Sequence, residues 1–187
     1  MIRSPDKGEI CILAGGLSAR MGRDKGRLRW RGKSLLQHVR SAARQASWPA
    51  RVIRRDIVPR CGPLGGVYTA LKTTRYDAVL FLACDMPFIT GEFIGRFLKL
   101  NGPAFAHGVE GAGFPFLLRR SAISLVEKQL LARRHSLQSL AQRCRARKVH
   151  APKGTHELFN VNTPKDWKRA REIQSKPCHC AQKKVTL

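Results

Sequence analysis

The chain has 187 residues, enough for one domain with a sizeable core, and 43% of them are hydrophobic, which argues against a disordered protein. Its longest apolar run, at 78–84, is far below the roughly 20 residues of a membrane-spanning helix, so we expect no membrane partner. The chain carries 36 Lys and Arg residues against 12 Asp and Glu, and this net charge of +24 favours anionic partners without selecting one.

The beginning of the sequence and its cysteines indicate a cytoplasmic protein. The apolar run at 10–14, which follows Arg3 and Lys7, is shorter than the roughly 7 to 15 apolar residues of a secretory signal. The six cysteines are irregularly spaced, and Cys11 and Cys84 lie within apolar runs. This usage favours reduced thiols over a disulfide framework.

The first quarter of the chain predicts a strand, a helix and a second strand. The apolar run at 10–13 is typical of a buried strand that enters a glycine-containing loop. Ser34 can cap a helix that ends before Pro49, because apolar and small residues follow at helical spacing. Val52 and Ile53 then suggest a short strand.

The same alternation continues through the middle of the chain. A turn at 63–66 is predicted to lead into a helix that carries Val67 and Ala70. The continuous apolar run at 78–84 predicts a central parallel strand covered on both faces. Thr90 can cap the helix that follows this strand.

The last part of the chain is predicted to contain a loop, three helices and one short strand. A segment with Gly111, Gly113 and Pro115 is expected to be the loop. The further elements expected are helices at about 121–132 and 136–145, a short strand at Val149, and a helix that begins at Thr163-Pro164. Alternating strands and helices imply an α/β sandwich.

The segment from Leu13 to Lys25 leaves the first predicted strand and could wrap a triphosphate. Gly15 and Gly16 let backbone amides approach phosphate oxygens, while Arg20 and Lys25 can neutralise negative charge. The alternative is an ordinary strand-to-helix turn, which would not need closely spaced cations.

A second phosphate-loop pattern, at 26–34, is rejected. Gly32-Lys33-Ser34 opens a helix, but five residues separate Gly26 from Gly32 where the P-loop motif has four. No strand is predicted before it. Lys33 is therefore not expected to bind phosphate.

Asp85 follows the strongest predicted strand directly. Ligands of α/β sheets bind outside the carboxyl ends of the strands, and a carboxylate is the expected ligand for Mg²⁺. The alternative is a carboxylate that only stabilises the turn at Met86-Pro87.

Two further patterns are given no function. Cys178-His179-Cys180 lacks a fourth ligand at ordinary zinc-finger spacing, so an incidental tail is the preferred interpretation. His38 lies on a predicted helix, and no Ser or Cys beside a His forms a readable nucleophilic set. Covalent catalysis therefore has no support, and neither does specific nucleic-acid binding, which would depend on charge alone.

Four sequence blocks together resemble the molybdenum cofactor guanylyltransferases, within the sugar-phosphate and cofactor nucleotidyltransferases. They occur in family order, at 13–25, 62–66, 84–87 and 160–164. The resemblance covers roughly residues 9–173, with a loose match over 103–155. It implies a three-layer, Rossmann-like α/β fold with a mostly parallel sheet. We therefore expect a nucleotidyltransferase domain at 9–173, between a flexible N-terminus at 1–8 and a basic flexible tail at 174–187.

The resemblance also implies roles for individual residues. The expected catalytic residues are Arg20, Lys25 and Asp85, with Asp85 as the Mg²⁺ ligand. Asn160 and Asn162 lie where the family binds its acceptor, although they could equally form a turn into the last helix. The expected nucleotide-binding residues are Leu13, Ala14, Gly15, Gly16, Ser18, Arg20, Met21, Lys25, Asp56, Pro63, Gly65 and Asp85.

The reaction implied by the resemblance is transfer of GMP from GTP to molybdopterin, or molybdenum cofactor, with release of pyrophosphate. Mg²⁺ is the implied cofactor, and a molybdoenzyme or its chaperone is a further partner. Two alternatives stay open: a related enzyme that uses CTP or a sugar phosphate, and a basic binding protein that keeps the fold without the chemistry.

The chain departs from the family pattern between residues 47 and 51. A strand-helix unit that the family carries at this point is absent from the sequence. We therefore expect a sheet with one strand fewer, and an effect on base selection, because this unit supplies a base-contacting side chain in the family.

Overall fold

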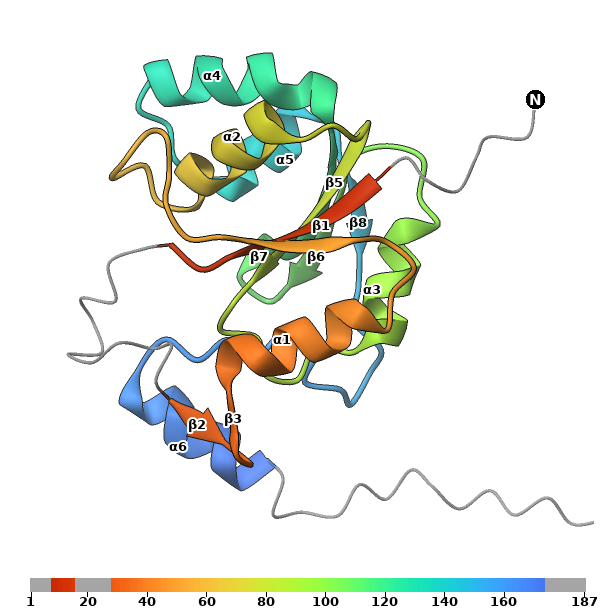
Figure 1. The fold of residues 1–187 in the computed structure, drawn as a ribbon, viewed down its shortest axis with the longest axis vertical. Helices are drawn as coiled ribbons and strands as arrows, with labels where there is room; N and C mark the ends of the chain where they lie inside the picture. The colour runs from red at the N-terminus through yellow and green to blue at the C-terminus, as the bar shows by residue number, and fades with distance from the viewer. Residues whose placement is uncertain (1–7, 16–27, 174–187) are drawn as a thin grey trace, which may run out of the picture.

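The computed structural model describes residues 8–15 and 28–173, and its centre is a sheet of six strands (Figure 1). The sheet order is β4-β1-β5-β7-β6-β8, and β7 is antiparallel to both of its neighbours. The other pairings are parallel, so five strands share one direction, as predicted. The strands are β1 (Gly8–Leu13), β4 (Ala50–Ile53), β5 (Ala78–Ala83), β6 (Ala104–Gly108), β7 (Gly111–Arg119) and β8 (Arg147–Val149).

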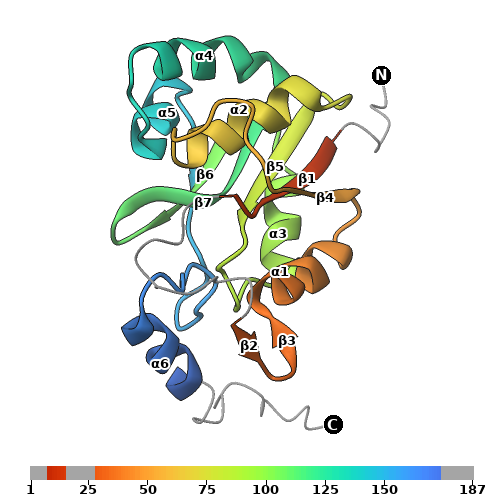
Figure 2. The ribbon, with the colours of Figure 1, turned by 60° about the vertical axis from the view of Figure 1, so that its left-hand side comes forward.

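Helices cover both faces of this sheet (Figures 1 and 2). One face carries α1 (Leu35–Arg44) and α3 (Gly91–Leu98), and the other carries α2 (Pro63–Thr73), α4 (Ile123–Leu131) and α5 (Leu137–Arg143). Successive side chains of a strand point to opposite faces. Ile10 and Ile12 of β1 accordingly join the core beneath α1 and α3, whereas Cys11 and Leu13 join the core on the other face. The predicted three-layer sandwich is confirmed.

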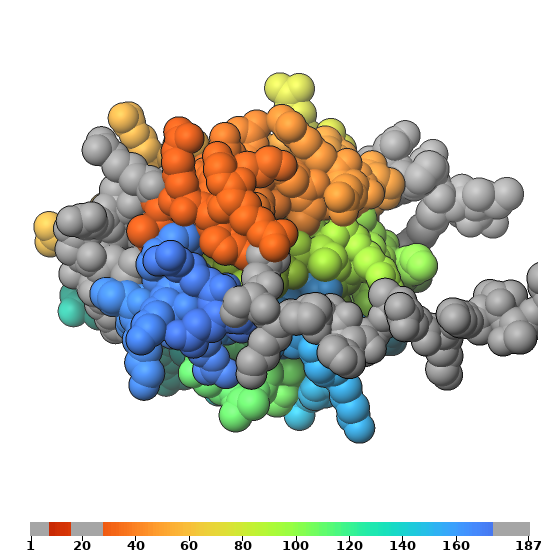
Figure 3. Space-filling model, turned by 90° about the horizontal axis from the view of Figure 1, so that it is seen from below, coloured from red at the N-terminus to blue at the C-terminus, as the bar shows by residue number. Residues whose placement is uncertain are grey.

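A small peripheral unit lies beside the sandwich. It consists of the β2–β3 hairpin, with β2 at Arg29–Trp30 and β3 at Lys33–Ser34, together with α6 (Pro164–Ile173). Figure 3 shows the segment around α6 against the hairpin region. Leu35, Val161 and Ala170 form a third, separate core that holds these elements together.

Local sequence signals explain where three helices begin. The Ser34 hydroxyl accepts a hydrogen bond from the Gln37 amide at 3.2 Å, and the Gln37 side chain accepts one from the Ser34 amide at 2.7 Å. Thr90 caps α3 by accepting from the Phe93 amide at 3.2 Å. Thr163 and Asp166 exchange equivalent bonds at the start of α6. The predicted caps are therefore confirmed.

The predicted loop around Gly111, Gly113 and Pro115 is wrong. These residues belong to β7, which forms a hairpin with β6 and also pairs with β5. Two glycines and a proline are typical of a loop, so the local sequence does not predict this strand. Its pairing depends instead on Phe116 and neighbouring apolar residues, which are buried against β5. For the same reason β5 has one antiparallel neighbour, and is not enclosed by parallel strands.

The predicted turn at 63–66 is also wrong. These residues form the first turn of α2, with Pro63 at its N-terminus. Proline is compatible with this position because its fixed φ suits the first helical turn, where an amide hydrogen has no partner within the helix. Leu64 and Gly65 are buried there, so the block is part of the fold as well as of the candidate site.

The connection between α1 and β4 agrees with the expected shortening of the sheet. Residues 45–49 lead from α1 directly to β4, and β4 pairs with β1. Arg51 of β4 binds the buried Glu9 carboxylate of β1 through two hydrogen bonds of 2.8 and 2.9 Å, and it also donates to Thr73 of α2 at 3.0 Å. The edge strand β4 is therefore bonded through Arg51 to both β1 and α2.

Within residues 8–15 and 28–173, no helix is both long and apolar enough to cross a membrane.

Candidate nucleotide-binding site

Three parallel strands end side by side, and the segments that follow them form the candidate site. The Ala14 amide, just past β1, donates to the Ile53 carbonyl of β4 at 2.8 Å. The Cys84 amide, just past β5, donates to the Leu13 carbonyl at 3.2 Å. We call this the carboxyl edge of the sheet; Gly15, Arg54 and Asp85 each lie within two residues of a strand end there. Ligands of α/β sheets usually bind at such an edge.

Asp85 lies half-buried in the turn after β5. Its backbone carbonyl accepts a hydrogen bond from the Val161 amide at 2.9 Å. This bond brings the segment with Asn160 and Asn162 next to Asp85, although 75 positions separate Asp85 from Asn160 in the numbering. The structure therefore brings together the predicted metal ligand and the predicted acceptor segment.

The two asparagines make local hydrogen bonds in the segment that leads into α6. The Asn160 side-chain amide donates to the Leu158 carbonyl at 3.2 Å, and the Asn162 backbone amide donates to the Asp166 carboxylate at 3.0 Å. Asn160 is half-buried and Asn162 is exposed. Their hydrogen bonds connect them to the start of the capped helix, and a contact of these residues with an acceptor stays a prediction.

Asp56 lies against two glycines of the predicted site. A methyl group added to Gly65 would lie 2.8 Å from the Asp56 Oδ2 atom, and one added to Gly15 would lie 3.4 Å from Oδ1. Close approach of this carboxylate therefore needs glycine at 65. Burial raises the pKa of Asp56 above its ordinary value.

A threonine fixes the loop that carries Asp56. The Thr69 hydroxyl of α2 accepts a hydrogen bond from the Ile57 amide at 2.9 Å and donates to the Gly65 carbonyl at 2.8 Å. The first bond joins the Asp56 loop to α2, and the second lies within the helix and reaches its first turn, where Pro63 is exposed and Gly65 is buried. Pro63 can therefore face a ligand, whereas Gly65 contributes by close packing.

Sequence reasoning missed a second connection at this edge. Glu157 is buried, at 5% exposure, and its carboxylate accepts from the Thr90 amide at 2.8 Å and from the Thr90 hydroxyl at 2.6 Å. Together with the bond between Val161 and Asp85, this joins residues 85–90 to residues 157–161 at two points. The available signal was an acid in a loop of a chain with only 12 acids.

Several predicted site residues lie outside the described part of the chain. They are Gly16, Ser18, Arg20, Met21 and Lys25, and the Cys178-His179-Cys180 sequence also falls outside it. Among described residues, no group of three or more His, Cys, Asp or Glu side chains could hold a metal ion. Asp85 is therefore not part of a group of three or more such ligands among the described residues. This fits an ion such as Mg²⁺, which commonly binds through one or two carboxylates together with substrate phosphates.

The rejected P-loop pattern has a different structure from a phosphate loop. Gly32 has a φ of 73° in the turn of the β2–β3 hairpin, and Ser34 caps α1. A short strand, β2, lies within the pattern, but it pairs with β3 and lies outside the main sheet. The residues before Gly26 lie outside the described part of the chain, so the expectation that no strand precedes the pattern stays a prediction. Lys33 is exposed on this hairpin.

The fold and the carboxyl edge define a Rossmann-like nucleotidyltransferase. Residues 10–149 match the family model described as "MobA-like NTP transferase domain", and the chain belongs to this family. A relative from Pseudomonas putida strain F1, named molybdenum cofactor guanylyltransferase, is 33% identical over 180 residues, which cover 83% of this chain and 93% of that protein. One from Carboxydothermus hydrogenoformans, named probable molybdenum cofactor guanylyltransferase, is 28% identical and covers 89% and 96%.

Solved structures share the fold. Molybdopterin-guanine dinucleotide biosynthesis protein A from Archaeoglobus fulgidus superposes with a TM-score of 0.67 at 21% identity, covering 89% of this chain and 98% of that one. A 4-diphosphocytidyl-2C-methyl-D-erythritol synthase from Anaerococcus prevotii gives a TM-score of 0.65 at 12% identity, covering 92% and 100%. At these identities the structures support the architecture alone.

The alignment with the Pseudomonas relative is consistent with a shortened sheet. The alignment has 180 positions. The aligned part of this chain is 83% of its 187 residues, which is fewer residues than the alignment has positions. The relative therefore has residues at positions where this chain has none, as the loss of a strand-helix unit would produce.

Proposed function

We propose that this protein is a molybdenum cofactor guanylyltransferase, which transfers GMP from GTP to molybdopterin, or molybdenum cofactor, and releases pyrophosphate. The observation that carries the proposal is at the carboxyl edge, where the Val161 amide donates a hydrogen bond to the Asp85 carbonyl, so that the segment proposed to bind the acceptor lies beside the residue proposed to bind the metal. Family membership and the names of the relatives support it. We place the catalytic domain at 9–173 and the protein in the cytoplasm.

The nucleotide would bind across the ends of β4, β1 and β5. Gly15 begins the proposed triphosphate loop, in which Gly16, Ser18 and Met21 would supply backbone contacts and Arg20 and Lys25 would supply positive charge. Leu13 and Ala14 form the base of this loop through their bonds to the neighbouring strands.

The Asp56 loop and the first turn of α2 would hold the nucleoside. The Asp56 carboxylate lies close to both Gly15 and Gly65 of α2. A carboxylate can accept hydrogen bonds from ribose hydroxyls or from base N–H groups. Pro63, exposed at the start of α2, offers an apolar contact to the same ligand.

The chemical step is attack by a terminal phosphate oxygen of the acceptor on the α-phosphorus of GTP. A phosphorus–oxygen bond forms to the acceptor, the bond to the β-phosphate bridging oxygen breaks, and pyrophosphate leaves. Asp85, together with the phosphates, would hold Mg²⁺, which would supply charge neutralisation. Lys25 and Arg20 stabilise charge on the transferring group, and Asn160 and Asn162 orient the acceptor. No covalent enzyme intermediate is required.

The direct test is a transfer assay with purified protein, Mg²⁺, molybdopterin and one nucleoside triphosphate at a time. We expect pyrophosphate release and a guanine dinucleotide product, detected by mass spectrometry, with GTP only. Efficient transfer from CTP would contradict the guanylyl assignment. Absence of transfer from any triphosphate, with intact nucleotide binding, would favour the non-catalytic binding protein.

Nucleotide selectivity can be measured separately by thermal unfolding. A ligand that binds the folded state stabilises it by about 2.7 kcal/mol at 100 times its dissociation constant. We expect GTP with Mg²⁺ to raise the melting temperature more than CTP, UTP or ATP at equal concentration. Equal shifts from all four would remove the guanine assignment while leaving a nucleotide site in place.

A molybdoenzyme or its chaperone would receive the product. The net charge of +24 supports an acidic partner surface, since complementary charge speeds association. Association of the purified protein with an acidic molybdoenzyme chaperone, measured at low and high salt, tests this part of the proposal.

A further inference from the structure

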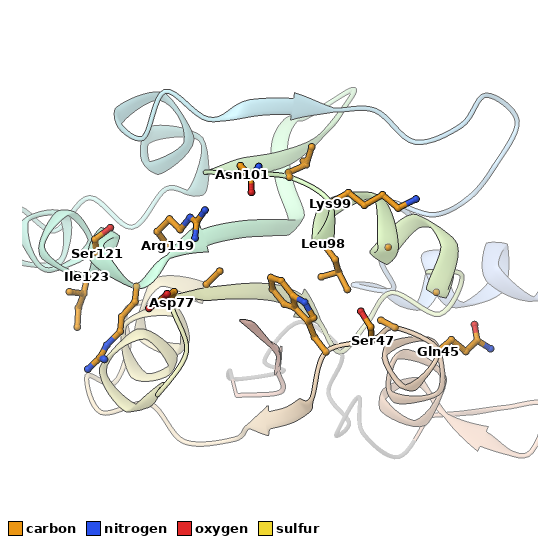
Figure 4. Close-up of a pocket in the computed structure, with 16 residues that line it drawn as sticks. Gln45, Ser47, Asp77, Leu98, Lys99, Asn101, Arg119, Ser121 and Ile123 are labelled. Atoms are coloured by element: carbon orange, nitrogen blue, oxygen red, sulfur yellow. The ribbon is translucent and has the colours of Figure 1, made fainter. Parts of the chain in front are cut away.

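A groove lies at the amino edge of the sheet, the edge where β1 and β5 begin at Gly8 and Ala78 (Figure 4). Its volume is about 1290 Å³. Strands of six residues span roughly 20 Å, so the groove lies at the opposite end of β1 and β5 from the candidate nucleotide site. Its walls include Trp48, Leu98, Lys99, Arg119, Arg120 and Ile123.

Three cations of this groove have no partner in the described part of the chain. Lys99 and Arg120 are exposed and Arg119 is half-buried, and within residues 8–15 and 28–173 their side chains form no ion pair or hydrogen bond. Arg51, by contrast, is fully engaged with Glu9, Thr73 and the Ala70 carbonyl. The groove cations are therefore available to an anionic ligand.

The rest of the groove is suited to a peptide. Trp48, Leu98 and Ile123 are half-buried and supply an apolar surface. A methyl group added to Gly8 would lie 2.1 Å from the Trp48 ring, so this ring rests directly on the backbone of β1. Figure 4 shows polar side chains beside these cations and apolar groups, among them Asn101 and Ser121, which can bond to a peptide backbone.

We propose that this groove binds an acidic, partly apolar peptide segment of a partner protein. Its three cations face one acid, Asp77, which gives the groove a net positive charge. The two ends of this chain carry positive charge and are therefore unsuited to a positive groove. Residues 1–7 carry Arg3 and Lys7 against Asp6, and residues 174–187 contain lysines and no acidic side chain.

A peptide suits the groove better than a nucleic acid does. The exposed Asp77 carboxylate can accept hydrogen bonds from peptide amides, whereas a phosphate backbone has no N–H group to donate to it. The apolar surface can hold a Leu or Phe side chain between two acids. The proposal does not depend on guanylyl transfer, since no residue of the groove belongs to the candidate nucleotide site.

The test uses fluorescence anisotropy with a labelled twelve-residue peptide rich in Asp and Glu and containing two leucines. We expect the double variant Lys99→Ala/Arg120→Ala to raise its dissociation constant about tenfold. The matched control is Arg143→Ala/Lys148→Ala, which removes one exposed Arg and one exposed Lys at α5 and β8. It should change the constant by less than about twofold.

Three results would overturn the proposal. The first is an equal loss in both double variants, which would mean that the overall charge alone attracts the peptide. The second is competition by twelve-residue oligothymidylate at an equal concentration, which would assign the groove to nucleic acid. The third is no measurable binding at 0.15 M salt. Thermal shifts with GTP, measured on the same variants, keep this outcome separate from the proposed transferase activity.

Discussion

The two edges of the central sheet differ in whether polar groups of the described residues have partners within the protein. At the carboxyl edge, loops distant in sequence are tied together, as Val161 is to Asp85 and Glu157 is to Thr90. At the amino edge, the described residues leave the cations of the groove without ionic partners. The first arrangement fixes geometry, as catalysis by positioning requires, and the second leaves charge for a partner to neutralise. The comparison predicts large effects on turnover at one edge and almost none at the other.

The largest effect is expected from Asp85→Asn. Asparagine keeps the size and much of the hydrogen bonding but loses the charge that a divalent ion needs, so turnover should fall by orders of magnitude while folding survives. Steady-state rates across a Mg²⁺ titration, together with a melting curve, measure both quantities. Near-normal turnover at limiting Mg²⁺ would assign Asp85 to the turn alone, because Asn and Asp are similar in such roles.

The second effect separates the two phosphate-loop patterns. We expect Lys25→Ala to weaken GTP binding by about a hundredfold, since a cation on the triphosphate is lost. Lys33→Ala is the matched control, because Lys33 is exposed on the β2–β3 hairpin. Isothermal titration with both variants gives the ranking. A larger loss from Lys33→Ala would move the site to the hairpin.

The third prediction concerns the connection between residues 85–90 and 157–161. Glu157→Gln should raise KM for molybdopterin about tenfold and lower the free energy of unfolding by about 1 to 3 kcal/mol, because a buried charged acceptor of two hydrogen bonds is lost. The dissociation constant of GTP should stay within about twofold. Glu110→Gln, at an exposed turn position, is the control. An equal loss of GTP affinity would indicate a general structural defect.

The smallest effect is expected at the amino edge. Lys99→Ala/Arg120→Ala should leave kcat and KM for both substrates within about twofold, because exposed charges roughly 20 Å from the reacting groups are strongly screened. The transfer assay at 0.15 M salt measures this. A tenfold fall in kcat would mean that the two edges communicate through the sheet.

Much of the fold was accessible from sequence because its signals are local. The apolar runs at 10–13 and 78–84, and the caps at Ser34, Thr90 and Thr163, each act over a few residues. The β6–β7 hairpin was missed because its evidence is pairing with β5, about 35 residues earlier, and its glycines and proline suggest a loop.

In the candidate site, too, features that depend on local sequence could be predicted and contacts between distant residues could not. Asp85 could be placed at the end of a strand from its sequence neighbours. The contact between Glu157 and Thr90 could not, because 67 positions separate the two residues and the cap signal at Thr90 does not indicate which distant residue binds it. The packing around Gly65 could not be predicted either, because a methyl group there would meet the Val58 carbonyl at 2.7 Å and the Asp56 carboxylate at 2.8 Å; a contact of Gly65 with the nucleotide stays a prediction.

The reactivity of the Cys11 thiol can report the separation of β1 from its neighbouring strands. It lies at the middle of β1 with no exposed surface, between β4 and β5. Burial, reinforced by the Glu9 carboxylate, raises the pKa of its thiol to about 12. The thiolate is the reactive form, so this cysteine should resist alkylating reagents at neutral pH for as long as the strands stay paired. Its labelling rate, followed by peptide mass spectrometry, would therefore time the separation of β1 from its neighbours under conditions in which the protein is still folded.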